Sequence, residues 1–187
     1  GAAVVEEVAG GWLRDLFGIP ASATTGFVTG GTMANFTGLA AGRHAVLAHV
    51  GYDVEANGLF GAPPITVLVG DEAHSTIFVA LRMLGLGDAR VVRVRADEQG
   101  RMRAPELLEA LARTDGPVIV CAQAGNVNTG AIDPIDEIAV ATNRKGAWLH
   151  GQEALGLWTW RSPALRPHSE RVRGTRSAGT AAALSAA

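Results

Sequence analysis

The sequence predicts an α/β fold in which helices flank a mostly parallel sheet. Two short apolar runs, at 65–70 and 117–123, are continuous and rich in β-branched residues, as is typical of strands buried on both faces. Segments with helical spacing alternate with such strands from residue 65 to residue 150. This alternation indicates an open parallel sheet with crossover helices. Ligands bind such sheets at the carboxyl ends of the strands, so the residues directly after each strand are the candidate site.

Each expected element has its own signal. The stretch 4–20 has the spacing of an amphipathic helix that Gly18 and Pro20 end, and 32–48 has helical spacing after a glycine turn. The later elements are, in order, a strand at 65–70, a helix at 74–87 closed by Gly85 and Gly87, an alternating strand at 89–97, a helix at 104–114 with Pro105 in its first turn, a strand at 117–123, a helix at 134–146 with a glycine stop, and a short strand at 147–150. No clear period follows Trp160.

Composition indicates one folded domain. The chain has 187 residues, of which 48% are apolar and 18% charged, and no apolar run approaches the roughly 20 residues that span a bilayer. Cys121 is the only cysteine, so no internal disulfide is expected, and its apolar surroundings predict a buried, unreactive thiol. No basic-then-apolar leader opens the sequence, and we expect a cytoplasmic protein without a membrane partner.

The charges are unevenly distributed. The net charge is −2; residues 161–187 hold five arginines and one acid, a balance of +4, which leaves −6 for 1–160. This basic segment has no aromatic side chain for base stacking, so we expect no nucleic-acid partner. No cluster of cysteine and histidine has the spacing of metal ligands, and we expect no metal site.

A glycine-rich stretch, Thr29-Gly30-Gly31-Thr32, opens the helix at 32–48. The N-terminus of a helix has unpaired N–H groups and about half a positive charge, which suit an anion such as phosphate. Glycines let a ligand approach the backbone, and Thr32 offers a hydroxyl to the ligand or as a helix cap. A plain glycine turn with a threonine cap explains the same residues equally well.

Three further polar stretches follow predicted strands. The ring of His74, after 65–70, can stack on an aromatic ligand or transfer a proton, or it can bond the backbone near a helix start. Asn126 and Asn128 follow 117–123, where they line a ligand site or serve ordinary turn chemistry. Gln152 and Glu153 follow the last strand.

The order of these stretches is more specific than any one of them. The Gly-Thr helix mouth, D-E-A-H-S at 71–75, A-Q-A-G-N-V-N-T-G at 122–130 and W-L-H at 148–150 resemble the group II pyridoxal-phosphate-dependent amino-acid decarboxylases, the relatives of the aromatic amino-acid, tyrosine and glutamate decarboxylases. The resemblance covers about residues 1–166. It implies the cofactor pyridoxal 5'-phosphate, loss of the α-carboxylate of an L-amino acid as CO2, and a homodimer.

The resemblance also implies a fold and roles for residues. Residues 1–160 would form part of the large domain of the fold-type I, aspartate aminotransferase-like fold. Gly30, Gly31 and Thr32 would hold the phosphate. His74 would stack over the pyridine ring and orient the substrate, and Asn126 or Asn128 would lie near the other substituents of the ring.

Two departures from the family pattern bear on activity. Gln152 stands where the family has the aspartate that pairs with the pyridine nitrogen, and the next residue, Glu153, is expected to point to the opposite face of the strand. The only lysine, Lys145, falls at a predicted helix end, where a cation suits the helix dipole. The Schiff-base lysine of the family is therefore absent, and we expect a fragment that is inactive, or nearly so, by itself.

The resemblance ends near residue 166. We interpret 161–187 as a divergent, basic, Ala-rich tail that is either disordered or the product of a shifted reading frame. Its sequence shows no periodic pattern and is rich in arginine and alanine. Two alternatives to a decarboxylase stay open, namely another fold-type I enzyme, such as an aminotransferase or a desulfurase-like lyase, and a non-catalytic phosphate-binding module on the same fold. A nicotinamide-binding Rossmann domain lacks its G-x-G-x-x-G fingerprint.

Overall fold

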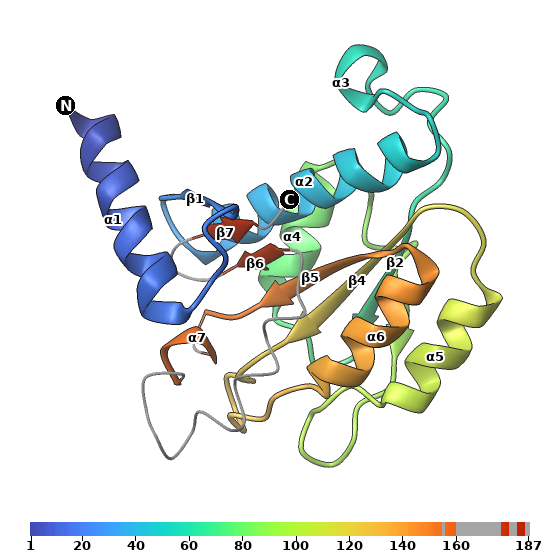
Figure 1. Cartoon of the computed structure of the whole chain (residues 1–187). Helices are drawn as coiled ribbons and strands as arrows, with labels where there is room; N and C mark the ends of the chain where they lie inside the picture. Colours follow the sequence, from blue (N-terminus) through green and yellow to red (C-terminus); the bar gives the residue numbers. More distant parts are fainter. Residues whose placement is uncertain (155, 160–176, 180–182, 186–187) are drawn as a thin grey trace.

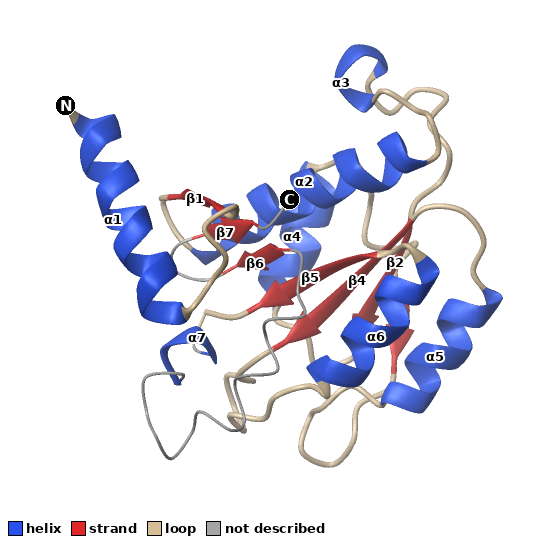
Figure 2. Ribbon diagram, viewed as in Figure 1, coloured by secondary structure: helices blue, strands red, loops and turns tan. Residues whose placement is uncertain are grey.

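The computed structural model describes residues 1–154, 156–159, 177–179 and 183–185. In this part of the chain, helices cover both faces of one sheet (Figure 1), as the view coloured by secondary structure also shows (Figure 2). The predicted α/β fold is confirmed.

The sheet is mostly parallel, as predicted. Its described strands are β1 (Thr24–Gly26), β2 (Thr66–Gly70), β3 (Val92–Val94), β4 (Val118–Gln123), β5 (Trp148–Gln152), β6 (Ser177–Gly179) and β7 (Ala183–Ser185). They lie in the order β1-β7-β6-β5-β4-β2-β3, and all neighbours from β6 to β3 are parallel. Only β7 runs antiparallel, to both β6 and β1.

Two layers of helices flank the sheet, and the described part of the chain has seven helices in all. They are α1 (Ala2–Phe17), α2 (Gly31–His49), α3 (Val54–Asn57), α4 (Ser75–Met83), α5 (Ala104–Arg113), α6 (Ile135–Lys145) and α7 (Gly156–Thr159). α2 and α4 pack on one face, and α5 and α6 cover the other (Figure 1).

The alternation of side chains along the strands divides the core between these layers. Leu68, Val120 and Leu149 pack toward α5 and α6, whereas Ile119 and Trp148 pack toward α2 and α4. Because both faces are covered, β4 is buried throughout its length, as its continuous apolar run predicts.

One glycine allows the close approach of α2 to the sheet. A Cβ atom on Gly42 would lie 2.7 Å from Cδ1 of Trp148, which is closer than real Cβ contacts. At Gly42 the backbone of α2 therefore packs directly against the indole of Trp148, at the start of β5. This contact places the first turn of α2 near the carboxyl ends of the strands.

Three differences from the predicted elements concern the sheet. The strand expected at 89–97 is only Val92–Val94, because it lies at the edge of the sheet and has a single partner, β2. The strand expected at 147–150 continues to Gln152, because β4 pairs with it that far. Three described strands were not predicted, namely β1 near the start of the chain and β6 and β7 in 161–187; the rest of that last segment lies outside the described residues.

The single thiol is buried, as predicted. Cys121 lies in the middle of β4, and burial raises its pKa from 9.0 to about 12, so it stays protonated at neutral pH. Over the described part of the chain, no helix combines the length and apolar character needed to cross a bilayer.

Candidate functional site

A cavity of about 280 Å³ opens where the carboxyl ends of β4 and β5 meet the first turns of α2 and α4. Its size is close to the lower end of the roughly 300–1,000 Å³ range of small-molecule sites. It is the position that the fold predicts for a ligand. The residues that line it are Gly31, Asn35, His74, Thr76, Gln123, Gly125, Val127, Gln152 and Ala154.

The mouth of α2 has the backbone geometry of an anion site. Gly30, at the N-cap, has φ +154°, which favours glycine, and a Cβ atom on Gly30 or Gly31 would meet no other atom within 4 Å. The first helical hydrogen bond runs from the N–H of Ala34 to the carbonyl of Gly30, at 3.0 Å. The N–H groups that precede Ala34 in the helix therefore have no partner within it, which leaves them available to an anion.

The expectation that Thr32 caps α2 is wrong. The helix begins one residue earlier than predicted, so Gly30 takes the cap position and no side chain caps the helix. Thr32 lies half-buried in the first turn, beside Gly31 but outside the lining of the cavity. Its proposed bond to a phosphate stays a prediction.

His74 combines both interpretations of its position. It is the N-cap of α4, where its Nδ1 accepts a hydrogen bond from the N–H of Thr76 at 3.3 Å and lies 2.9 Å from the hydroxyl of Thr76. The same residue lines the cavity and is exposed to solvent. Bonding to the backbone near a helix start and facing a ligand site are thus compatible roles.

A polar network that sequence reasoning missed connects His74 to the core. The hydroxyl of Thr76 lies 3.0 Å from Nδ2 of Asn35 and 3.3 Å from Nε2 of Gln152. Oδ1 of Asn35 lies 3.0 Å from Nε2 of His150, which is fully buried. Burial lowers the pKa of His150 from 6.5 to about 4, so the imidazole is neutral at neutral pH. An asparagine on the apolar face of a predicted helix was the available sequence signal.

Gln152 lies at the end of β5 with only half of its amide satisfied. Its Nε2 donates to Thr76, whereas its Oε1 is buried and has no hydrogen-bond partner among the described residues. A buried acceptor without a donor is costly unless a ligand supplies one. The neighbouring Glu153 is fully buried and does not line the cavity.

The structure does not bring Asn126 or Asn128 to the cavity. Oδ1 of Asn126 accepts hydrogen bonds from the backbone N–H groups of Asn128 at 2.9 Å and Thr129 at 3.2 Å, which is an Asx turn. The lining is formed by the residues on either side of Asn126, namely Gly125 and Val127. Turn chemistry accounts for Asn126.

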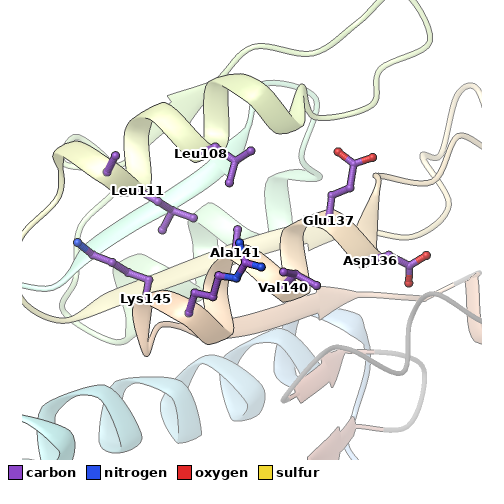
Figure 3. A pocket seen from close by; sticks show the side chains of 9 residues that line it. Leu108, Leu111, Asp136, Glu137, Val140, Ala141 and Lys145 are labelled. Carbon is purple, nitrogen blue, oxygen red and sulfur yellow. The ribbon is translucent and has the colours of Figure 1, made fainter.

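Lys145 lies far from this cavity. It is the last residue of α6, three residues before β5 begins, whereas Gln152 is the last residue of β5. The four residue steps along β5 span about 13 Å. Lys145 lines a different cavity of about 590 Å³ between α5 and α6 (Figure 3), which shares no residue with the first.

The described residues fit a small phosphorylated aromatic ring that binds without a covalent bond. Open space at the mouth of α2 suits a phosphate, the imidazole of His74 suits a ring, and the buried Oε1 of Gln152 suits a ring N–H. No amine side chain lines the cavity. No group of three or more His, Cys, Asp or Glu among the described residues has the arrangement of a metal site.

Comparison with known proteins gives consistent results. The family model described as the pyridoxal-dependent decarboxylase conserved domain matches residues 2–181, so the similarity continues past residue 166, where we expected it to end. An aromatic-L-amino-acid decarboxylase of Bacillus atrophaeus is 34% identical over 160 residues, which are 83% of this chain and 31% of that protein. An L-2,4-diaminobutyrate decarboxylase of Rhizobium meliloti (strain 1021) is 35% identical over 159 residues, which are 83% of this chain and 30% of that protein.

Solved structures agree. The crystal structure of mouse CSAD in apo form has a TM-score of 0.84 and 27% identity, and covers 98% of this chain and 41% of that one. The glutamate decarboxylase domain of a Vibrio parahaemolyticus protein has a TM-score of 0.87, covers 98% of this chain and 43% of that one, and at 24% identity supports the fold alone. The chain spans about a third of the length of the two curated relatives named above.

Proposed function

Because the chain belongs to the family of pyridoxal-dependent decarboxylases, we propose that its cavity binds pyridoxal 5'-phosphate and that the whole protein removes the α-carboxylate of an L-amino acid as CO2. The observation that supports this best is that Gly31, His74 and Gln152 line one cavity. These residues come from three separate segments that the fold brings to the carboxyl edge of the sheet.

Each residue has a defined part in the proposal. The N–H groups at the mouth of α2, with Gly30, Gly31 and the hydroxyl of Thr32, hold the phosphate. His74 lies over the ring and orients the substrate, and Gln152 faces the ring nitrogen. When bound, pyridoxal phosphate supplies the electron sink for the bond that breaks.

The amide of Gln152 limits what the site does. A carboxylate stabilises a protonated ring nitrogen through a charged hydrogen bond worth about 1.5–3 kcal/mol, and a neutral amide gives less. The difference corresponds to roughly tenfold to a hundredfold in a rate that depends on that charge. We therefore propose that binding depends more on the phosphate than on the ring nitrogen.

The position of Lys145 leads to the second part of the proposal. The only lysine of the chain lies at the other edge of the sheet, so the chain holds the cofactor without a covalent bond and by itself decarboxylates poorly or not at all. We propose that residues 1–160 are part of a cofactor-binding large domain, to whose sheet the divergent segment 161–187 adds β6 and β7, in a cytoplasmic protein whose complete form is a homodimer.

A binding experiment tests the cofactor. The tryptophan fluorescence of the chain is titrated with pyridoxal 5'-phosphate and, as a matched ligand, with pyridoxal. We expect the phosphorylated ligand to bind at least about tenfold more tightly, because only it engages the mouth of α2. His74→Ala should weaken binding by about tenfold, whereas His44→Ala, on the same helix layer but outside the cavity, should not. Equal affinity for both ligands, or no effect of His74→Ala, contradicts the proposal.

Reduction with borohydride tests the lysine. Peptide mapping after reduction should find no stoichiometric cofactor label at Lys145, and Lys145→Arg should bind pyridoxal phosphate as the parent does. A stoichiometric label at Lys145 that disappears together with binding in Lys145→Arg would show that this lysine holds the cofactor.

A second candidate is a non-catalytic phosphate-binding module on the same fold, which the distance of Lys145 from the cavity favours. Release of labelled CO2 from carboxyl-labelled amino acids separates the two. A chain that binds pyridoxal phosphate but releases no CO2, even when a lysine-bearing segment of a relative is fused to its C-terminal end, is such a module.

A further inference from the structure

We infer that Thr76 is a positioning residue, whose hydroxyl fixes the ring proton of His74 on Nε2 and thereby makes His74 a hydrogen-bond donor toward the cavity. This inference deepens the proposed cofactor site and rests on it only for the identity of the ligand. It follows from the number of donors and acceptors around one hydroxyl.

The hydroxyl of Thr76 has three polar neighbours. Nδ2 of Asn35 lies 3.0 Å away and Nε2 of Gln152 lies 3.3 Å away, and both amide nitrogens can only donate. These two bonds occupy both lone pairs of the hydroxyl oxygen. Its single proton is therefore directed to the third neighbour, Nδ1 of His74, at 2.9 Å.

A backbone group excludes the reversed arrangement. If the amide of Asn35 were turned around, the hydroxyl of Thr76 would donate to Asn35, and Nδ1 of His74 would have to carry a proton. The N–H of Thr76 also points at Nδ1, at 3.3 Å, and a backbone N–H can only donate. Nδ1 of His74 is thus an acceptor, and the proton of the neutral ring lies on Nε2.

The same reasoning extends into the core. With Nδ2 of Asn35 directed to Thr76, its Oδ1 faces Nε2 of His150 at 3.0 Å and must accept from it. Asn35 and His150 are both buried, and burial keeps His150 uncharged. A single neutral tautomer, protonated on Nε2, is therefore set for His150 as well as for His74.

The arrangement defines what His74 can do for a ligand. Its Nδ1 is engaged by Thr76, and its free nitrogen carries a proton. The neutral ring can therefore donate a hydrogen bond to an acceptor oxygen, such as a carboxylate or a phosphate, but it cannot accept a proton there. His74 acts as a hydrogen-bond donor to the ligand, and not as a general base through Nε2.

Nuclear magnetic resonance of the ligand-free chain tests the tautomers. Long-range proton–nitrogen correlations of ¹⁵N-histidine-labelled protein are recorded above neutral pH, and His74 and His150 are assigned with His74→Ala and His150→Gln. We expect both rings to be protonated on Nε2 and unprotonated on Nδ1. A proton on Nδ1 of either ring overturns the inference, and this measurement needs no variant of Thr76.

A pair of variants tests the hydroxyl itself. In Thr76→Val the Nδ1 resonance of His74 should move toward the value of a nitrogen without a hydrogen-bonded donor, whereas Thr76→Ser should keep the parent value. Melting curves identify a Thr76→Val protein that does not fold, in which case Thr76→Ala takes its place. An unchanged Nδ1 resonance in a folded variant without the hydroxyl would show that Thr76 does not position His74.

Binding separates this inference from the proposed function. Thr76→Val should weaken the binding of pyridoxal 5'-phosphate by about threefold to tenfold, as loss of one orienting contact does, and Thr76→Ser should restore it. Binding by neither the parent nor the variants, with both tautomers as expected, contradicts the proposed cofactor but leaves the role of Thr76 intact. Parent-like binding by Thr76→Val contradicts a role for Thr76 toward the ligand.

Discussion

Nε2 of His150 lies 3.0 Å from Oδ1 of Asn35, and this bond joins β5 to α2 inside the core. Both side chains are buried, and water does not reach the imidazole. The bond is compatible with a neutral ring, and burial lowers the pKa of His150 from 6.5 to about 4. Protonation of His150 at mildly acidic pH therefore requires that the core open to water.

The first prediction concerns acid stability. Above pH 6.5 His150 is neutral in both the folded and the unfolded chain, and its contribution to the free energy of unfolding is complete. As the pH falls from 6.5 toward about 4, only the unfolded chain gains a proton at His150, so the free energy of unfolding decreases. Between about pH 7.5 and pH 4.5 the loss is about 2–3 kcal/mol. Urea unfolding of the parent and of His150→Gln at both pH values measures it.

Comparing the parent with His150→Gln separates the effect of His150 from the effects of the other titrating groups, which both proteins share. Burial raises the pKa of Asp133 from 3.8 to about 6, so the folded chain holds that proton more tightly and stability falls as the pH rises through this window. This contribution opposes that of His150, but it is common to both proteins. An equal loss of stability in the parent and in His150→Gln would contradict the prediction.

The second prediction concerns Asp133, which links the loop before α5 to the end of β4. Its two carboxyl oxygens accept from the N–H groups of Met102 and Gln123, each at 2.7 Å. Asn in its place has one oxygen, and its NH2 group would face a backbone N–H. We expect Asp133→Asn to lower the free energy of unfolding by about 2–4 kcal/mol in urea titrations at neutral pH.

Asp115→Asn is the matched control. Asp115 is exposed, so its change should stay within about 0.5 kcal/mol of the parent. If Asp133→Asn falls within the same interval, the two short bonds do not stabilise the fold.

The sequence predicted those elements whose signals are local. Continuous apolar runs indicated β2 and β4, and a proline in the first turn and a glycine stop marked α5 and α6. His74 and the mouth of α2 were placed by the rule that ligands lie after the strands. Gly31 and His74 do line one cavity.

What the sequence did not predict depends on pairing and packing. Gly151 and Gln152 have little preference for a strand, and they continue β5 because Ala122 and Gln123 of β4 pair with them. Asn35 and His150 are 115 residues apart, and only the packing of α2 on β5 brings them together. No local pattern contains that information.

The third prediction concerns the packing of α2 against the sheet at Gly42. In most helices Gly→Ala is stabilising by up to about 1 kcal/mol, because alanine is the better helix former. At Gly42 a methyl group would lie 2.7 Å from Trp148, and overpacking of this kind costs about 1–3 kcal/mol. We expect Gly42→Ala to be destabilising in thermal and urea unfolding.

Gly11→Ala in α1 has the same chemistry without the clash, since the nearest atom to its Cβ, Nη2 of Arg14, would lie 3.9 Å away. This variant should equal or exceed the parent in stability. A Gly42→Ala protein that is as stable as Gly11→Ala would mean that the indole of Trp148 moves aside without cost.

The fourth prediction decides between the two interpretations of the loop after β4. Oδ1 of Asn126 closes the Asx turn by accepting from the N–H groups of Asn128 and Thr129, and the side chain of Asn126 is buried. Asn126→Ala leaves these N–H groups without their acceptor and should lower the free energy of unfolding by about 1–2 kcal/mol. Asn128→Ala removes an exposed side chain and should stay within about 0.5 kcal/mol of the parent. We expect Asn128→Ala also to keep the parent affinity for pyridoxal 5'-phosphate, measured by tryptophan fluorescence.

A loss of affinity in Asn128→Ala at unchanged stability would instead place the Asn128 amide at the ligand, as the family resemblance first suggested. Because Asn128 does not line the cavity, that result would also require the loop to rearrange when the ligand binds.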